Sequence, residues 1–220
     1  APNNLSEKDF LFLKNNYDQR RYGYKASAVP GTVAGILEAH KRYGNLPLKQ
    51  ILQPVISQAK KGIYVSYDLN QAIGSAEQLT LDSESKNIYY KNKVPLKEHM
   101  LVKRSDLAWT LNEIARDGRE AFYSGPISEK IVKAMQQNNG YITANDLKNY
   151  QPKFSQPIQT SYRDHTVLAH PPPAGGAAVL LEGLNIIENF ETNKMGPNSA
   201  SFVHLFAEAL QRGHMDRSRF

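Results

Sequence analysis

The chain has 220 residues, of which 40% are hydrophobic and 22% charged, and its formal net charge is +6. It is long enough to bury a hydrophobic core, and no stretch approaches the roughly 20 apolar residues that a membrane-spanning helix needs. It contains no cysteine, which excludes disulfides and a cysteine nucleophile, and its scattered Lys and Arg residues argue against a nucleic-acid-binding surface.

Three helices are predicted in the first part of the chain. Ser6 can cap a short helix, and the polar residues 15–25 predict a loop after it. A second helix begins at Pro30-Gly31 and ends at Gly44. The third covers Leu48–Lys61, and its apolar residues are expected to form one buried stripe: Leu48, Ile51, Leu52, Val55 and Ala59. Pro54 is expected to kink this helix or to split it in two.

The middle of the chain alternates helices with turns. Ser66–Lys86 predicts an interrupted helix, and Ile88–Val94 predicts a small hairpin. Ser105 is expected to cap an amphipathic helix that ends at Asp117-Gly118, and the next helix begins at Gly125-Pro126. Thr143 is expected to cap a short helix that reaches Tyr150, with Asp146 in its first turn, where the helix dipole favours a carboxylate.

Beyond Pro152 the hydrophobic period changes. Ile158–Tyr162 and Thr166–Ala169 predict a β-hairpin. The triple proline Pro171–Pro173 predicts a rigid extended run, because each ring restricts the backbone. Two helices are predicted to follow, over Ala177–Phe190 and Ser199–Met215, with these residues inward: Leu180, Leu181, Leu184, Ile187, Phe202, Leu205, Phe206 and Ala209. The chain has no internal repeat and no convincing linker, so residues 1–220 are expected to form a single domain fragment.

Motifs of common catalytic sites are missing: the chain has no G-x-S-x-G, no Walker A, no dinucleotide fingerprint and no H-E-x-x-H. His204 and Glu208 lie four residues apart on one predicted helix, with His214 and Asp216 beyond them. They could begin a metal site, but a polar helix face explains them more simply, because a usable site needs three or more convergent ligands. No metal site is therefore assigned.

Two other local patterns have both a functional and a structural interpretation. Asp164 and His165 could form a triad with Ser161, although turn chemistry explains Asp164 more simply. The start of the helix after the prolines, at Gly175-Gly176, exposes free N–H groups that suit an anion or a closely approaching backbone. A plain strand-to-helix connector is the alternative there.

Five motif segments occur in order along the chain: Ala28–Gly35 with Tyr43–Pro47, Asp117–Gly125, Gly140–Tyr150, Tyr162–Phe190, and Ala207–Arg217. They resemble V-P-G-x-V-A-G … Y-G-x-L-P, G-x-x-x-F-Y-x-G, G-x-[IL]-T-x-x-D-L-x-x-Y, Y-R … P-P-P-S-S-G-G … L-N-I-L-E-x-F and the closing helix of the gamma-glutamyltransferase large subunit. Any single match is short, but five in register with natural spacing make the chain similar to that family.

The resemblance implies an N-terminal-nucleophile hydrolase of α+β class. The whole enzyme would be a four-layer αββα sandwich, to which this chain contributes mostly helices and a few strands. Relatives are made as one precursor that cleaves itself before a Thr, whose free α-amine then acts as its own general base. The resemblance thus implies cleavage of γ-glutamyl amides of glutathione-like donors, a small subunit from the same precursor as partner, and a periplasmic or secreted location. The absence of a membrane span is expected from the lack of a long apolar stretch.

The matching positions carry no catalytic residue. By the resemblance, the nucleophilic Thr lies beyond Phe220, and the Arg that grips the donor α-carboxylate lies just before Ala1. Ala174-Gly175-Gly176-Ala177 replaces the family's Ser-Ser-Gly-Gly and lacks both hydroxyls. No substrate-binding residue is assigned, Gly175 and Gly176 being candidates only, and no residue is assigned to a cofactor. The alternative is a non-catalytic homologue or binding fragment that keeps the scaffold without the nucleophile.

Overall fold

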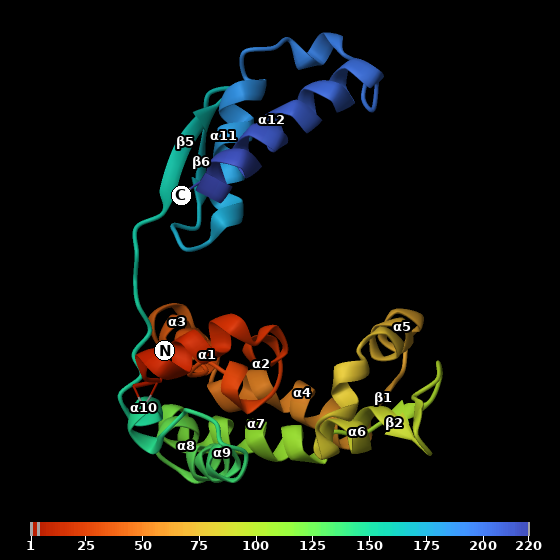
Figure 1. Ribbon diagram of the computed structural model, residues 1–220, viewed down its shortest axis with the longest axis vertical. Coiled ribbons are helices and arrows are strands. Elements are labelled where there is room, and N and C mark those ends of the chain that lie inside the picture. The colour runs from red at the N-terminus through yellow and green to blue at the C-terminus, as the bar shows by residue number, and fades with distance from the viewer. Residues whose placement is uncertain (1, 4, 220) are drawn as a thin grey trace. The chain divides into compact units, whose positions relative to one another are not determined.

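The computed structural model describes residues 2–3 and 5–219. The chain divides into two compact units, Ala1–Pro152 and Lys153–Phe220 (Figure 1). The expectation that residues 1–220 form a single domain fragment is not decided by this division and stays a prediction.

The first unit is a helical assembly with two very short strand pairs (Figure 1). Its helices are α1 Glu7–Asn15, α2 Tyr17–Arg21, α3 Thr32–Tyr43, α4 Leu48–Lys61, α5 Tyr67–Ser75, α6 Ser83–Tyr89, α7 Ser105–Asp117, α8 Arg119–Tyr123, α9 Pro126–Gln137 and α10 Ala144–Lys148. Strand β1 (Ile63–Tyr64) pairs with β4 (Leu101–Val102), and β2 (Tyr90–Lys91) pairs with β3 (Val94–Pro95), both antiparallel.

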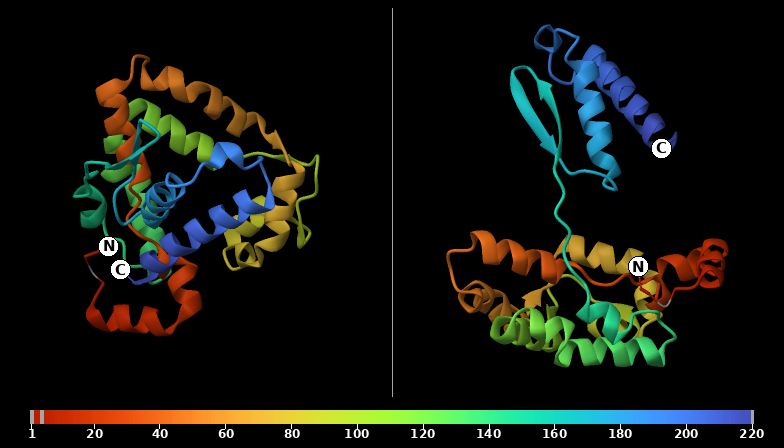
Figure 2. Two further views of the ribbon diagram at one scale, coloured as in Figure 1. Left: turned by 90° about the horizontal axis from the view of Figure 1, so that it is seen from above. Right: turned by 90° about the vertical axis from the view of Figure 1, so that its left-hand side faces the viewer.

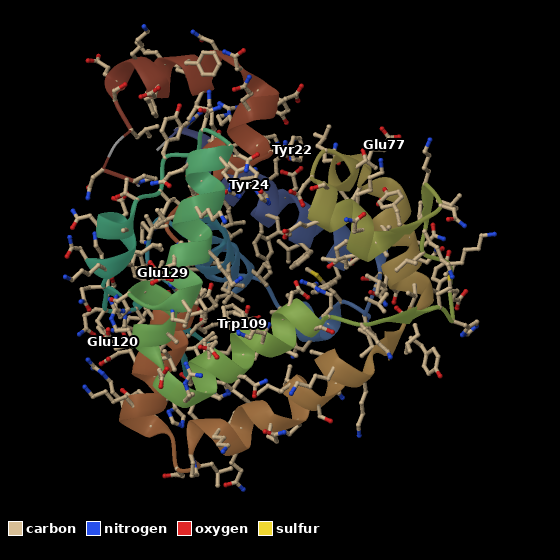
Figure 3. The ribbon with its side chains drawn as sticks, turned by 90° about the horizontal axis from the view of Figure 1, so that it is seen from below. Tyr22, Tyr24, Glu77, Trp109, Glu120 and Glu129 are labelled. Carbon is tan, nitrogen blue, oxygen red and sulfur yellow. The ribbon has the colours of Figure 1, made fainter. Side chains whose placement is uncertain are left out.

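The main core of this unit is built from α3, α7, α8, α9 and α10. Tyr123 is 1% exposed and Leu147 is fully buried within it. Trp109, partly buried, packs against this cluster from α7, and the ammonium of Lys130 on α9 lies 4.9 Å from the centre of its ring (Figure 3). A second, smaller cluster gathers around Val65 and Ile73.

The start of α3 is capped from another helix. Its N-cap residue is Gly31, which has no side chain to offer to the first-turn N–H groups. The hydroxyl of Tyr123 on α8 accepts a hydrogen bond from Ala34 N (3.1 Å) and donates one to Pro30 O (2.6 Å). Tyr150 stacks on Tyr123, with ring centres 5.9 Å apart. The V-P-G segment is thus held by the aromatic residues of two other motif segments.

The second unit consists of a β-hairpin and two helices packed against each other (Figure 2). Strands β5 (Ile158–Tyr162) and β6 (His165–Ala169) pair antiparallel, and α11 (Gly175–Ile187) and α12 (Ala200–Arg219) follow. The two helices approach closely at Gly213, where an added Cβ would lie 3.0 Å from Val179 Cα. Gly213 therefore sets the contact between α11 and α12.

The expected caps at Ser6 and Thr143 and the predicted hairpin are confirmed, whereas the expected cap at Ser105 is wrong: Ser105 is the first residue of α7, and the N-cap residue Arg104 makes no side-chain hydrogen bond to the helix. Ser6 and Asp9 form a capping box at α1, and Thr143 and Asp146 form one at α10. The hairpin of β5 and β6 occurs where the alternation predicted it, with one more residue, His165, in its second strand. The mostly helical α+β character of the chain is also confirmed.

Other expectations about secondary structure are wrong. The polar residues 15–25, predicted as a loop, contain α2 and a short 3₁₀ turn at Tyr24–Ala26. Of the two outcomes expected at Pro54, the split is wrong, because α4 is continuous from Leu48 to Lys61, and the kink stays a prediction. The triple proline does not remain extended: Ala174 N, the first N–H after the prolines, donates to Pro171 O and closes a turn. The short strands β1 and β4 were not predicted.

The predicted buried faces are partly wrong. On α4 the fully buried residue is Ile56, whereas Ile51 is 43% and Val55 46% exposed. On α11 and α12, Leu181, Ile187 and Ala209 are buried as expected, but Leu180 is 48% and Phe206 45% exposed. Among the described residues, no helix combines the length and apolar character required to cross a membrane.

Candidate functional site

The candidate site from the sequence, Gly175 and Gly176, lies in the first turn of α11. The N-cap residue Ala174 provides no side-chain hydrogen bond, so no side chain caps the first-turn N–H groups. A helix N-terminus carries a partial positive charge and free donors, which favour a negatively charged group. Nothing lies within 4 Å of a Cβ built on Gly176, so the backbone is open to an approaching group there.

An arginine from the neighbouring helix adds a full positive charge at the same place. A Cβ on Gly175 would lie 2.9 Å from Cδ and 3.0 Å from Cζ of Arg217, so this side chain of α12 lies directly against the glycine backbone. Any larger residue at position 175 would displace the arginine. Arg217 was not identified from the sequence, because its contact with Gly175 is set by the packing of α12 on α11 and no pattern near residue 217 indicates it.

Two carboxylates lie near this positive end. Glu182, one to two turns further along α11, faces Asp216, the residue before Arg217. Burial and the neighbouring Asp216 carboxylate together raise the pKa of Glu182. Anion binding at the start of α11 depends on the first-turn N–H groups and Arg217, which also suit a closely approaching backbone, whereas the two carboxylates oppose a second negative charge. The glycines, alanines and arginine supply no nucleophile.

The hairpin residues considered for a triad are not brought together. Tyr162 pairs with His165 and Ser161 with Thr166, so Ser161 and His165 belong to opposite faces of the hairpin. Asp164 has a positive φ of 63°, which is typical of a tight two-residue turn. The turn interpretation of Asp164 is therefore the one that the geometry supports.

The possible metal half-site on α12 is occupied by an ion pair. Glu208 accepts a hydrogen bond from Arg212 at 2.6 Å, and this bond lowers the pKa of Glu208. Within residues 2–3 and 5–219, no group of three or more His, Asp or Glu side chains could hold a metal ion. The polar-face interpretation accounts for the contacts of Glu208.

Three threonines make structural contacts through their hydroxyls. The hydroxyl of Thr110 donates to Asp106 O at 3.0 Å, that of Thr160 to Asn185 Oδ1 at 2.6 Å, and that of Thr143 caps α10. Moreover, the α-amine of an internal threonine is part of a peptide bond, so it cannot act as the general base of an N-terminal nucleophile. None of these threonines can perform that chemistry as it stands.

Comparison with known proteins gives one consistent family. The family model described as gamma-glutamyltranspeptidase matches residues 1–220. The glutathione hydrolase proenzyme of Escherichia coli (strain K12) is 36% identical over 224 residues, covering 100% of this chain and 39% of that protein. The Acylase ACY 1 proenzyme of Pseudomonas sp. (strain V22) is 36% identical over 197 residues, covering 89% of this chain and 35% of that protein.

A solved structure supports the same relationship. The crystal structure of Helicobacter pylori gamma-glutamyltranspeptidase matches with a TM-score of 0.85 at 35% identity, covering 91% of this chain and 58% of that one. The chain thus spans 39% of the length of the curated E. coli relative and 58% of the chain in the H. pylori structure.

Proposed function

Because the chain belongs to the gamma-glutamyltranspeptidase family, we propose that it is the large-subunit portion of an enzyme that cleaves γ-glutamyl amides of glutathione-like donors. The observation that carries this proposal is the match of the whole chain, at 36% identity, to a glutathione hydrolase proenzyme. The word proenzyme in that relative's name supports a precursor that is processed.

The chemistry would depend on a residue outside this chain. A threonine in a segment that follows residue 220 becomes N-terminal after self-cleavage, and its α-amine takes the proton of its hydroxyl during attack on the γ-glutamyl carbonyl. The acyl-enzyme then passes to water or to an acceptor amine. This chain and the small subunit of the same precursor form a heterodimer, in which the four-layer αββα sandwich is completed.

The start of α11 is the surface of this chain that we assign to substrate. Gly175 and Gly176 offer backbone N–H groups, and Arg217 adds a cation beside them. γ-Glutamyl substrates carry carboxylates. Backbone N–H groups and an arginine side chain bind carboxylates through charge-assisted hydrogen bonds. We place the enzyme in the periplasm or outside the cell, on the family resemblance alone.

A related acyl group is the second candidate substrate. One relative of equal identity is named an acylase, and the two hydroxyls of the family's Ser-Ser-Gly-Gly segment are missing at Ala174–Ala177. A shared fold does not determine the substrate. The non-catalytic alternative is not favoured, since the named relatives are a hydrolase and an acylase.

The test is the intact mass of the protein encoded by the full reading frame. Two species that sum to the precursor, the smaller beginning with Thr, would establish self-processing. Release of anilide from a γ-glutamyl anilide would then support the γ-glutamyl substrate, and release from an acylated β-lactam alone would support an acylase. A single mass, stable over days at neutral pH, would contradict the proposal.

A further inference from the structure

Asp146 is a buried carboxylate whose two oxygens accept hydrogen bonds from different parts of the chain. It is 5% exposed. Oδ2 accepts hydrogen bonds from Thr143 N (2.9 Å) and Thr143 Oγ1 (2.7 Å), and Asp146 N donates to Thr143 Oγ1 (3.2 Å), so the local capping box of α10 is complete. Oδ1 accepts a bond of 2.8 Å from Asn3 N, 143 residues away in the chain.

The bond to Asn3 is not needed for the helix cap. A capping box is complete when the side chain at the third position reaches back to the N-cap residue, which Oδ2 already does. A buried carboxylate oxygen must nevertheless find a donor, since leaving it unpaired is costly. Oδ1 of Asp146 therefore accepts its hydrogen bond from the backbone N–H of Asn3, near the start of the chain.

Tyr141 makes a second bond from the same motif segment to the same part of the chain. Its hydroxyl donates to Asp9 Oδ1 at 3.2 Å, across 132 residues of sequence. Asp9 also closes the capping box of α1 with Ser6. Residues 3 and 9 are thus each tied to residues 141–146, by contacts that are independent of each other.

Close packing at Gly140 reinforces this connection. A Cβ on Gly140 would lie 3.2 Å from Tyr24 Cβ and 3.3 Å from Tyr24 O, so the segment lies directly against the region that follows α2. Leu13 of α1 is buried as well, at 9% exposure. The early part of the chain is therefore docked onto the Gly140–Asp146 segment along several contacts rather than at one point.

We propose that Asp146, assisted by Tyr141, is a positioning residue that anchors the early segment, meaning Asn3 and helix α1. This anchor holds the residues that precede Pro2 in the longer protein at the donor site, where the γ-glutamyl substrate binds. This inference rests on the proposed function, because the resemblance places the donor-gripping arginine just before Ala1. Consecutive Cα atoms are about 3.8 Å apart, so an anchor at Asn3 limits the reach of the few residues that precede it. Without the anchor, donor binding has to order that segment at an entropic cost.

Four single variants of the full reading frame separate the anchor from the helix cap. Asp146→Ala removes both, whereas Thr143→Ala removes much of the capping box and leaves the carboxylate for Asn3. Asn3→Pro removes the N–H donor, at the cost of a restricted backbone at that position, and leaves the capping box of α10 intact. Asn3→Ala keeps the donor, since the bond to Asp146 uses the backbone N–H of Asn3. Each protein is purified, its self-cleavage verified by mass, and its fold verified by circular dichroism.

The expected result is a change in KM rather than kcat. Loss of a hydrogen bond to a charged group predicts that Asp146→Ala and Asn3→Pro raise KM for a γ-glutamyl anilide roughly tenfold, with kcat changed less than about twofold. Thr143→Ala and Asn3→Ala should stay within about twofold of the wild type in both constants. Amide hydrogen exchange in peptides covering residues 5–13 should accelerate in the first two variants only.

Two results would overturn the proposal. Equal KM increases in Asp146→Ala and Thr143→Ala would mean that Asp146 only caps α10, and a wild-type KM in Asn3→Pro would mean that the anchor does not act on the donor site. If the wild-type precursor neither cleaves itself nor releases anilide, the proposed function fails, and the positioning role fails with it. Hydrogen exchange would still decide, in that case, whether Asp146 holds the early segment.

Discussion

The cap that Tyr123 provides to α3 can be tested by removing one oxygen atom. Tyr123→Phe keeps the ring and its stacking on Tyr150 but leaves Ala34 N and Pro30 O without their partner. Ala34 N lies in the first turn, where the helix itself offers no acceptor, and Tyr123 is only 1% exposed, so water cannot replace the hydroxyl. An unsatisfied buried group costs about 1–3 kcal/mol, so we expect about 2 kcal/mol of destabilisation.

The chain provides its own probe for this measurement. Trp109 is the single tryptophan, and it packs against the cluster that contains Tyr123. Urea unfolding followed by tryptophan fluorescence therefore reports on this unit. With a urea dependence of about 2 kcal/mol/M, the unfolding midpoint should fall by about 1 M.

Tyr43→Phe is the matched control, because Tyr43 lies on α3 and is 79% exposed. Its unfolding midpoint should match that of the wild type, since a hydroxyl in water loses nothing on removal. If Tyr123→Phe unfolds within about 0.5 kcal/mol of this control, the hydroxyl does not cap α3 and the reasoning is refuted.

Three further outcomes follow from the contacts. Gly31→Ala should destabilise the chain by about 1–3 kcal/mol, because its Cβ would collide with the Tyr150 side chain. Gly35→Ala should stabilise α3 by about 0.5–1 kcal/mol, because nothing lies within 4 Å of its Cβ. Urea unfolding measures both. The hydrogen bond from Ser85 N lowers the pKa of Asp82 below the ordinary value of about 3.9. The contribution of Asp82 to the free energy of unfolding is therefore complete above that pH and is lost as the pH falls further. The acid-induced drop in stability should be smaller in Asp82→Asn. Gly213→Ala should loosen α12 from α11 and lower the thermal midpoint of circular dichroism by about 2–6 °C. Gly176→Ala, in open space like Gly35→Ala, should not lower it.

Features that depend on neighbouring residues could be predicted from the sequence. The caps at Ser6 and Thr143 follow from side chains that reach only three residues along the chain. The hairpin of β5 and β6 follows from alternation and a short polar turn. In each case the interacting groups are close in sequence, so the pattern itself contains the contact.

Features that depend on distant residues could not be predicted in this way. Apolar residues surround α4 widely enough to allow more than one buried face, and packing against α7 leaves Ile56 buried and Val55 exposed. Similarly, nothing near Arg217 in the sequence indicates that its side chain lies against Gly175. The partner of each residue is set by tertiary packing, which local periodicity does not encode.

The motif segments acquire a common physical meaning from these distant contacts. Pro30 binds Tyr123 and Gly31 approaches Tyr150, so three segments that match the family separately are joined to one another in the first unit. These contacts hold backbone segments together and include no nucleophile. A match of such residues to the family therefore establishes the fold more directly than the reaction. A homologue that had lost the nucleophilic threonine would keep all of these contacts. This is why the mass of the processed precursor, rather than any property of residues 1–220, decides whether the enzyme is active.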